Sequence, residues 1–135
     1  MRSLGLLTVG LIVAITAVVA AGGQQLQASG GQQDYSVYCK SCHGMEGKGD
    51  GVLAAALRKR PTDLTRFAND NDGKFPEEKV FKAIDGLARG EAAAGSDMPA
   101  WHDVFSKSQE SASPEAVKAR IESLVKYIET MQAKK

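Results

Sequence analysis

Two cysteines and a histidine lie within five consecutive residues of this chain. Cys39 and Cys42 are separated by two residues, and His43 follows directly. Two thiols at this spacing on one helical turn can each add across a vinyl group of a porphyrin, which gives two thioether bonds. The neighbouring imidazole then lies close enough to the ring to bind the iron from one side. The pattern therefore predicts one covalently attached haem c, with His43 as the proximal iron ligand.

Two other kinds of site use cysteines at this spacing. A redox disulfide of the C-x-x-C type usually lies near a strand–helix–strand pattern, and the sequence shows no such pattern. A structural zinc ion needs four ligands, which Cys39, Cys42, His43 and the distant His102 could supply. Adjacent ligands at Cys42 and His43 are poorly spaced for a tetrahedron, so haem attachment is the favoured interpretation and the other two remain alternatives.

A haem iron bound by His43 has a second axial position on the opposite side of the porphyrin. Met98 is the predicted ligand, because it lies in a loop between predicted helices and Pro99 stiffens the backbone after it. A thioether on such a loop can reach the distal face. With both axial positions filled, no open site remains for oxygen, peroxide or a substrate.

The other candidates for that position are interpreted differently. Met45 is too close to His43 in sequence to reach the opposite face of the ring. Met131 belongs to the apolar stripe of the last predicted helix, which favours core packing. His102 is the rival ligand, although a lone histidine is more often a surface or supporting residue. Trp101, the one tryptophan, is expected to pack in the core or at the haem edge, where its indole N–H could reach a propionate.

The spacing of apolar residues predicts an all-α fold. Four helices are expected, and no stretch alternates as a strand would. Four glycines between residues 44 and 51 predict a loop that approaches a flat ligand closely. The last helix has the clearest signals, with Ser113 as its cap and Pro114 in its first turn. The expected helices cover residues 34–42, 76–85, 99–105 and 114–131.

The amino-terminal segment is distinct from the rest of the chain, because a short basic start precedes an uncharged run of eighteen residues at 4–21. This run is longer than the usual signal core of roughly 7–15 residues. It is close to the about 20 residues that span a bilayer. Residues 1–23 are therefore predicted to be a signal peptide, cleaved near Ala21 or Gly23, or a retained membrane anchor. A linker at 24–32 and a folded domain at 33–135 follow.

Composition and charge place few further limits on function. Hydrophobic residues make up 43% of the 135 residues, whereas aromatic residues make up only 6%. A small core with few aromatic rings gains packing surface from a large apolar prosthetic group. The net charge of +1 gives no indication of nucleic-acid binding. The basic cluster at 58–60 is interpreted as a surface patch, with a docking or propionate-facing role as the alternative.

These motifs together resemble the class I mono-haem cytochrome c family, especially its bacterial members. The resemblance covers residues 33 to 131 and depends on the segment Cys39–Gly44, the glycine-rich loop, Pro61, the Met98-Pro99 pair and the long final helix. It implies helices wrapped around one haem that is attached through Cys39 and Cys42 and ligated by His43 and Met98. It also implies that the Pro61 carbonyl accepts a hydrogen bond from the His43 ring. Because the chain is longer between these two residues than in compact members, another carbonyl within 59–64 is the alternative.

The expected function is one-electron transfer between respiratory-chain components rather than enzymatic catalysis. The partners would be other redox proteins, bound through small and weak interfaces. Export by the amino-terminal segment predicts a periplasmic location, soluble or anchored to the outer face of the cytoplasmic membrane. A haem subunit of a larger dehydrogenase or oxidase is the alternative function. A haem-based sensor or peroxidase-like protein with a labile distal ligand is a further one.

Overall fold

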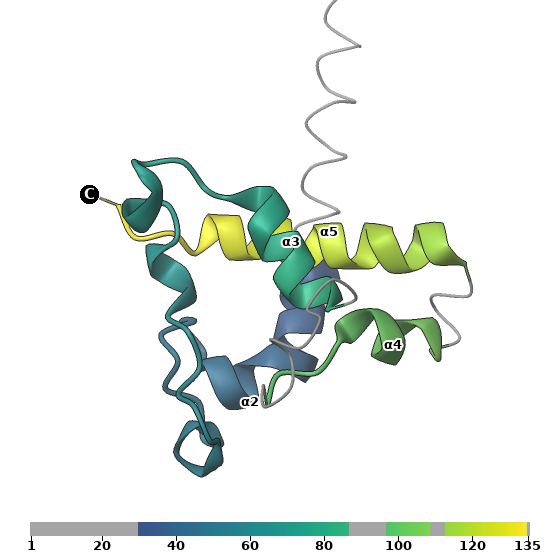
Figure 1. The fold of residues 1–135 in the computed structure, drawn as a ribbon, viewed down its shortest axis with the longest axis horizontal. Helices are drawn as coiled ribbons and strands as arrows, with labels where there is room; N and C mark the ends of the chain where they lie inside the picture. Colours follow the sequence, from purple (N-terminus) through teal and green to yellow (C-terminus); the bar gives the residue numbers. More distant parts are fainter. Residues whose placement is uncertain (1–29, 87–96, 109–112, 135) are drawn as a thin grey trace, which may run out of the picture.

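The computed structural model describes residues 30–86, 97–108 and 113–134 (Figure 1). Within these ranges the backbone forms helices and turns and contains no strand, which confirms the predicted all-α class. The predicted leader at 1–23 and the first part of the predicted linker lie outside the described residues. No helix in the described ranges is both long and apolar enough to cross a membrane.

The labelled elements of the described ranges are mostly short, and two of them exceed six residues. Residues 30–43 form one continuous helical run, the first helix of the described chain. After a helical stretch at residues 30–34, the elements in chain order are η1 (Tyr35–Cys39, a π-helical turn), α2 (Lys40–His43), the 3₁₀ turns η2 (Ala54–Ala56), η3 (Leu64–Arg66) and η4 (Asn69–Asn71), α3 (Glu77–Asp85), α4 (Trp101–Ser106) and α5 (Pro114–Thr130).

Most predicted helices are present, with shifted ends. Helical backbone is already present at Gly30, the first described residue, rather than only from Asp34, so residues 30–32 of the predicted linker are helical. α4 begins at Trp101 rather than Pro99, because Ala100 keeps an extended backbone (ψ 103°). In α5, Ser113 caps the Ala116 N–H and Pro114 is the first helical residue, as predicted.

The first helix includes the last residues of the predicted linker, where it packs directly on α5. A methyl group at Gly31 would overlap the backbone carbonyl of Ser123, so only glycine allows the two backbones this close. Three residues later, both carboxylate oxygens of Asp34 accept hydrogen bonds from Arg120, each at 2.7 Å. This guanidinium also lies 4.3 Å from the centre of the Phe105 ring of α4, which adds a cation–π contact. One arginine therefore joins three helices.

The buried core lies among α3, α4, α5 and the first helix (Figure 1). α5 contributes the predicted apolar stripe, and Met131 packs against its edge as expected. Tyr38 forms edge-on contacts with the rings of Trp101 and Phe105. The fully or nearly buried side chains are Tyr35, Leu64, Val80, Ile84, Trp101, Phe105, Val117, Ile121, Leu124, Val125 and Ile128.

We predict that Gly31→Ala lowers the free energy of unfolding by about 1–3 kcal/mol, because the added methyl group must push the first helix away from α5. Urea denaturation of the purified protein measures this change. Gly30→Ala is the matched control, since a methyl group there meets no atom within 4 Å. It should be neutral or slightly stabilising, and equal effects of the two variants would contradict the close crossing.

Candidate functional site

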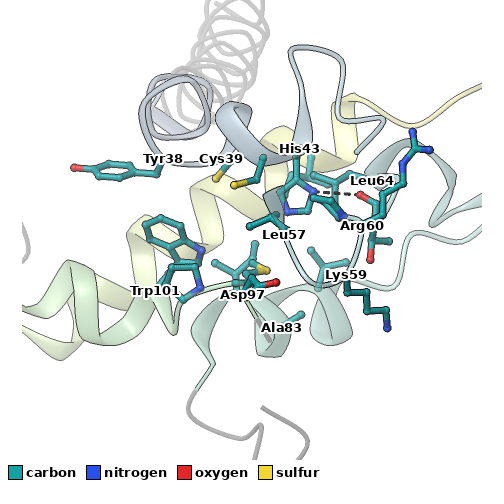
Figure 2. Close-up of a pocket in the computed structure, with 18 of the residues that line it drawn as sticks. Tyr38, Cys39, His43, Leu57, Lys59, Arg60, Leu64, Ala83, Asp97 and Trp101 are labelled. Carbon is teal, nitrogen blue, oxygen red and sulfur yellow. Dashed lines mark hydrogen bonds between the residues drawn. The ribbon is translucent and has the colours of Figure 1, made fainter. Parts of the chain in front are cut away.

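One pocket of about 560 Å³ opens between α2, the segment at 57–64 and the start of α4 (Figure 2). This volume lies within the range of about 300–1,000 Å³ typical of small-molecule and cofactor sites. Its apolar wall comes from four separate parts of the chain, so the pocket exists only in the folded protein. The apolar side chains in this wall are Leu57, Leu64, Phe67, Val80, Ile84 and Ile128.

All six residues predicted for the site line this pocket. They come from the first helix, from the segment after η2 and from the stretch that leads into α4. The structure therefore brings together side chains that the sequence separates widely. These residues are Cys39, Cys42, His43, Pro61, Met98 and Trp101.

The His43 ring is held by a hydrogen bond from Nδ1 to the carbonyl oxygen of Thr62, at 3.2 Å (Figure 2, dashed line). A carbonyl oxygen only accepts, so Nδ1 carries the proton. Burial lowers the pKa of His43, against the smaller opposing effect of the Thr62 bond, which favours the neutral ring. In this tautomer Nε2 keeps a lone pair. Histidines that bind metals typically have this arrangement, with the other ring nitrogen bound to a carbonyl or carboxylate.

The carbonyl that accepts this bond was predicted to belong to Pro61, and that prediction was wrong by one residue. The Pro61 carbonyl faces the backbone of Gly49 so closely that a Cβ atom there would overlap it. Gly49 also has a φ of +72°, which glycine adopts at little cost. Thr62 comes next in the chain, and its carbonyl lies within reach of His43. The sequence indicated that a carbonyl within 59–64 accepts this bond but did not identify which one.

The two thiols lie on the pocket wall and form no disulfide. Burial raises the pKa of the Cys39 thiol to about 12, with smaller contributions from the charges of Asp34 and Cys42. At neutral pH this cysteine is therefore a thiol rather than a thiolate. The site does not activate it as a nucleophile of the kind that reactive cysteines provide.

The other candidates for the second axial ligand lie elsewhere. Met45 is 74% exposed, and Met131 packs on the hydrophobic core. His102 turns its Nδ1 toward the Asp85 carboxylate at 2.9 Å and so joins α4 to the end of α3. None of the three belongs to the pocket lining, whereas Met98 does.

The zinc alternative gains no support from the side-chain arrangement. Across residues 30–86, 97–108 and 113–134, no three histidine, cysteine or acidic side chains are grouped as a metal site would require. His102, the fourth ligand in that interpretation, pairs with Asp85 instead.

Comparison with known proteins adds nothing to this picture. No protein-family model matches the chain, and neither the curated proteins nor the solved structures contain a match. The functional interpretation therefore depends on the pocket and its residues.

We predict that Gly49→Ala lowers the free energy of unfolding by about 2 kcal/mol or more. Alanine costs about 1–2 kcal/mol at positive φ, and here its methyl group also displaces the Pro61 carbonyl. Chemical denaturation measures the loss. Gly73→Ala is the control, because Gly73 has φ +81° but no atom within 4 Å of the added methyl group. If Gly73→Ala lowers the free energy of unfolding by as much, the contact with Pro61 does not contribute to the effect at Gly49.

Proposed function

We propose that this pocket holds one haem c, bound covalently through Cys39 and Cys42, and that the protein is a one-electron carrier. The observation that carries the proposal is the convergence of both thiols, the His43 imidazole and the Met98 thioether on one apolar pocket of cofactor size. Three of these groups lie within residues 39–43, and the fold brings the fourth, the distant Met98, to the same pocket. The proposal includes the cytochrome c type of fold, in which helices surround the haem.

The residues of the pocket fit such a group in three respects. The neutral His43 ring has a lone pair on Nε2 while Thr62 holds Nδ1, which suits a metal ligand. The wall is mainly apolar, as a porphyrin requires. Cys39 and Cys42 lie within four residues of His43 in the chain and line the same pocket, and both are unbonded thiols that can add across vinyl groups.

Bound haem supplies a one-electron couple at its iron. His43 and Met98 would fill both axial positions and so exclude oxygen, peroxide and substrates from the metal. A thioether ligand raises the reduction potential, and the apolar wall excludes water from the site. These properties favour electron transfer over catalysis, so the protein would not be an enzyme by itself.

The proposed partners are other redox proteins of a respiratory chain, which dock briefly through interfaces of under about 1,200 Å². The proposed location is the periplasm, because residues 1–23 have the pattern of a signal peptide or membrane anchor. In the alternative function, the protein is the haem subunit of a larger dehydrogenase or oxidase and uses the same site. Co-purification with a catalytic subunit would identify that role.

We predict that Cys39→Ala combined with Cys42→Ala abolishes covalent haem, because no thiol remains to form a thioether. The intact mass of protein exported from a host with c-type maturation machinery measures this loss. Lys40→Ala, which changes an exposed residue between the two cysteines, should keep the haem mass. Haem that resists acid-acetone extraction from the double variant would refute attachment at these residues.

We predict that Met98→Ala lowers the reduction potential by about 0.1 V or more, within the range of about 0.8 V that axial ligands span. It should also open the iron to carbon monoxide and imidazole. Redox titration and ligand-binding spectra measure both effects, with Met45→Ala as the exposed control. An unchanged potential would contradict the ligand assignment. Rapid carbon monoxide binding by the unmodified ferrous protein would instead favour the sensor or peroxidase-like alternative.

A further inference from the structure

We propose that Asp97 is a positioning residue that holds Met98 at the pocket by binding the segment at 58–62. This inference rests on the proposed function, because it concerns the strength with which Met98 is retained as an iron ligand. Asp97 directly precedes Met98 and itself lines the pocket. In Figure 2 it lies across the pocket from His43.

The Asp97 carboxylate binds the neighbouring segment with both oxygens. Oδ2 accepts the backbone N–H of Arg58 at 2.7 Å, and Oδ1 accepts the Nε–H of the same residue at 2.9 Å. One backbone amide and one guanidinium thus bind one side chain that is 20% exposed.

The segment that Asp97 binds is also the one that holds the His43 ring. Arg58 donates to Asp97 at one end of this stretch, and the Thr62 carbonyl accepts from His43 at the other. The segment is itself anchored to the glycine-rich loop, where the Arg60 Nε–H donates to the Gly49 carbonyl at 3.3 Å. One short piece of backbone therefore connects the two residues proposed as axial ligands.

This connection matters because Met98 precedes α4 rather than lying within it. The helix, which begins at Trp101, fixes the chain on the carboxyl side of Met98. Asp97 supplies a fixed point on its amino side. A neutral thioether depends on such positioning more than a charged ligand would, since electrostatic attraction to the iron does not hold it.

The Arg58 backbone amide, and not the arginine side chain, should carry most of this effect. The Arg58 side chain is 69% exposed, and exposed ion pairs contribute little. Hydrogen bonds from backbone amides to an ionised carboxylate are charge-assisted and shorter than neutral ones. Removal of the carboxylate and removal of the guanidinium should therefore have different consequences.

The test uses the full-length haem-loaded protein and three variants, Asp97→Ala, Asp97→Asn and Arg58→Gln. Imidazole affinity of the ferric form is measured, together with the weak red absorption band of the iron–methionine bond. Imidazole binds only where Met98 has left the iron, so its apparent affinity reports the population of that state. Asp103→Ala, a change at an exposed aspartate of α4, is the control.

We expect imidazole to bind Asp97→Ala about tenfold or more tightly than the unmodified protein, with a weakened red band. Asp97→Asn should be intermediate, because the amide keeps one acceptor oxygen. Arg58→Gln and Asp103→Ala should stay within about twofold. If Asp97→Ala does not load haem, the imidazole affinity of Asp97→Asn is compared with that of the unmodified protein instead.

Three outcomes would overturn the inference. Unchanged imidazole affinity in a haem-loaded Asp97 variant refutes it and leaves the proposed function intact. A lower free energy of unfolding with unchanged imidazole affinity assigns Asp97 a structural role only. An unmodified protein whose intact mass lacks haem refutes the proposed function, and the inference with it.

Discussion

The close crossing of the first helix over α5 is the contact on which the rest of the structure depends. Gly31 allows the backbones to approach, and the paired hydrogen bonds between Asp34 and Arg120 fix how the helices meet. Both charged side chains are 13% exposed. Removal of either partner would therefore leave a poorly solvated charge, which is strongly unfavourable. The helix fixed in this way is the one that ends in Cys39, Cys42 and His43.

The pocket is framed by this helix on one side and by the segment at 58–62 on the other. The Tyr35 hydroxyl donates to the Gly44 carbonyl at 2.7 Å inside the core, so the end of the first helix is fixed as well as its start. Gly49 of the glycine-rich loop packs against the Pro61 carbonyl. The next carbonyl, that of Thr62, accepts the hydrogen bond that orients the His43 ring.

Sequence reasoning succeeded where a local signal was strong. Ser113 and Pro114 marked the start of α5, and its apolar stripe is buried as expected. It failed at Gly31, which lies in a stretch with the composition of a linker, because the need for glycine at the crossing is visible only from the position of Ser123. It also missed the bonds from Arg58 to Asp97, since these residues lie 39 positions apart and nothing in their local sequence pairs them.

The sequence alone determined the helical class, the spacing of Cys39, Cys42 and His43, and the candidates for a second ligand. These features depend on residues a few positions apart, where geometry follows from the helical repeat. Only the tertiary structure decided that Met98 and not His102 lines the pocket, and that Thr62 rather than Pro61 accepts the bond from His43. Those choices depend on long-range packing, which places the His43 ring within hydrogen-bonding distance of one carbonyl of the segment at 58–62 rather than its neighbour.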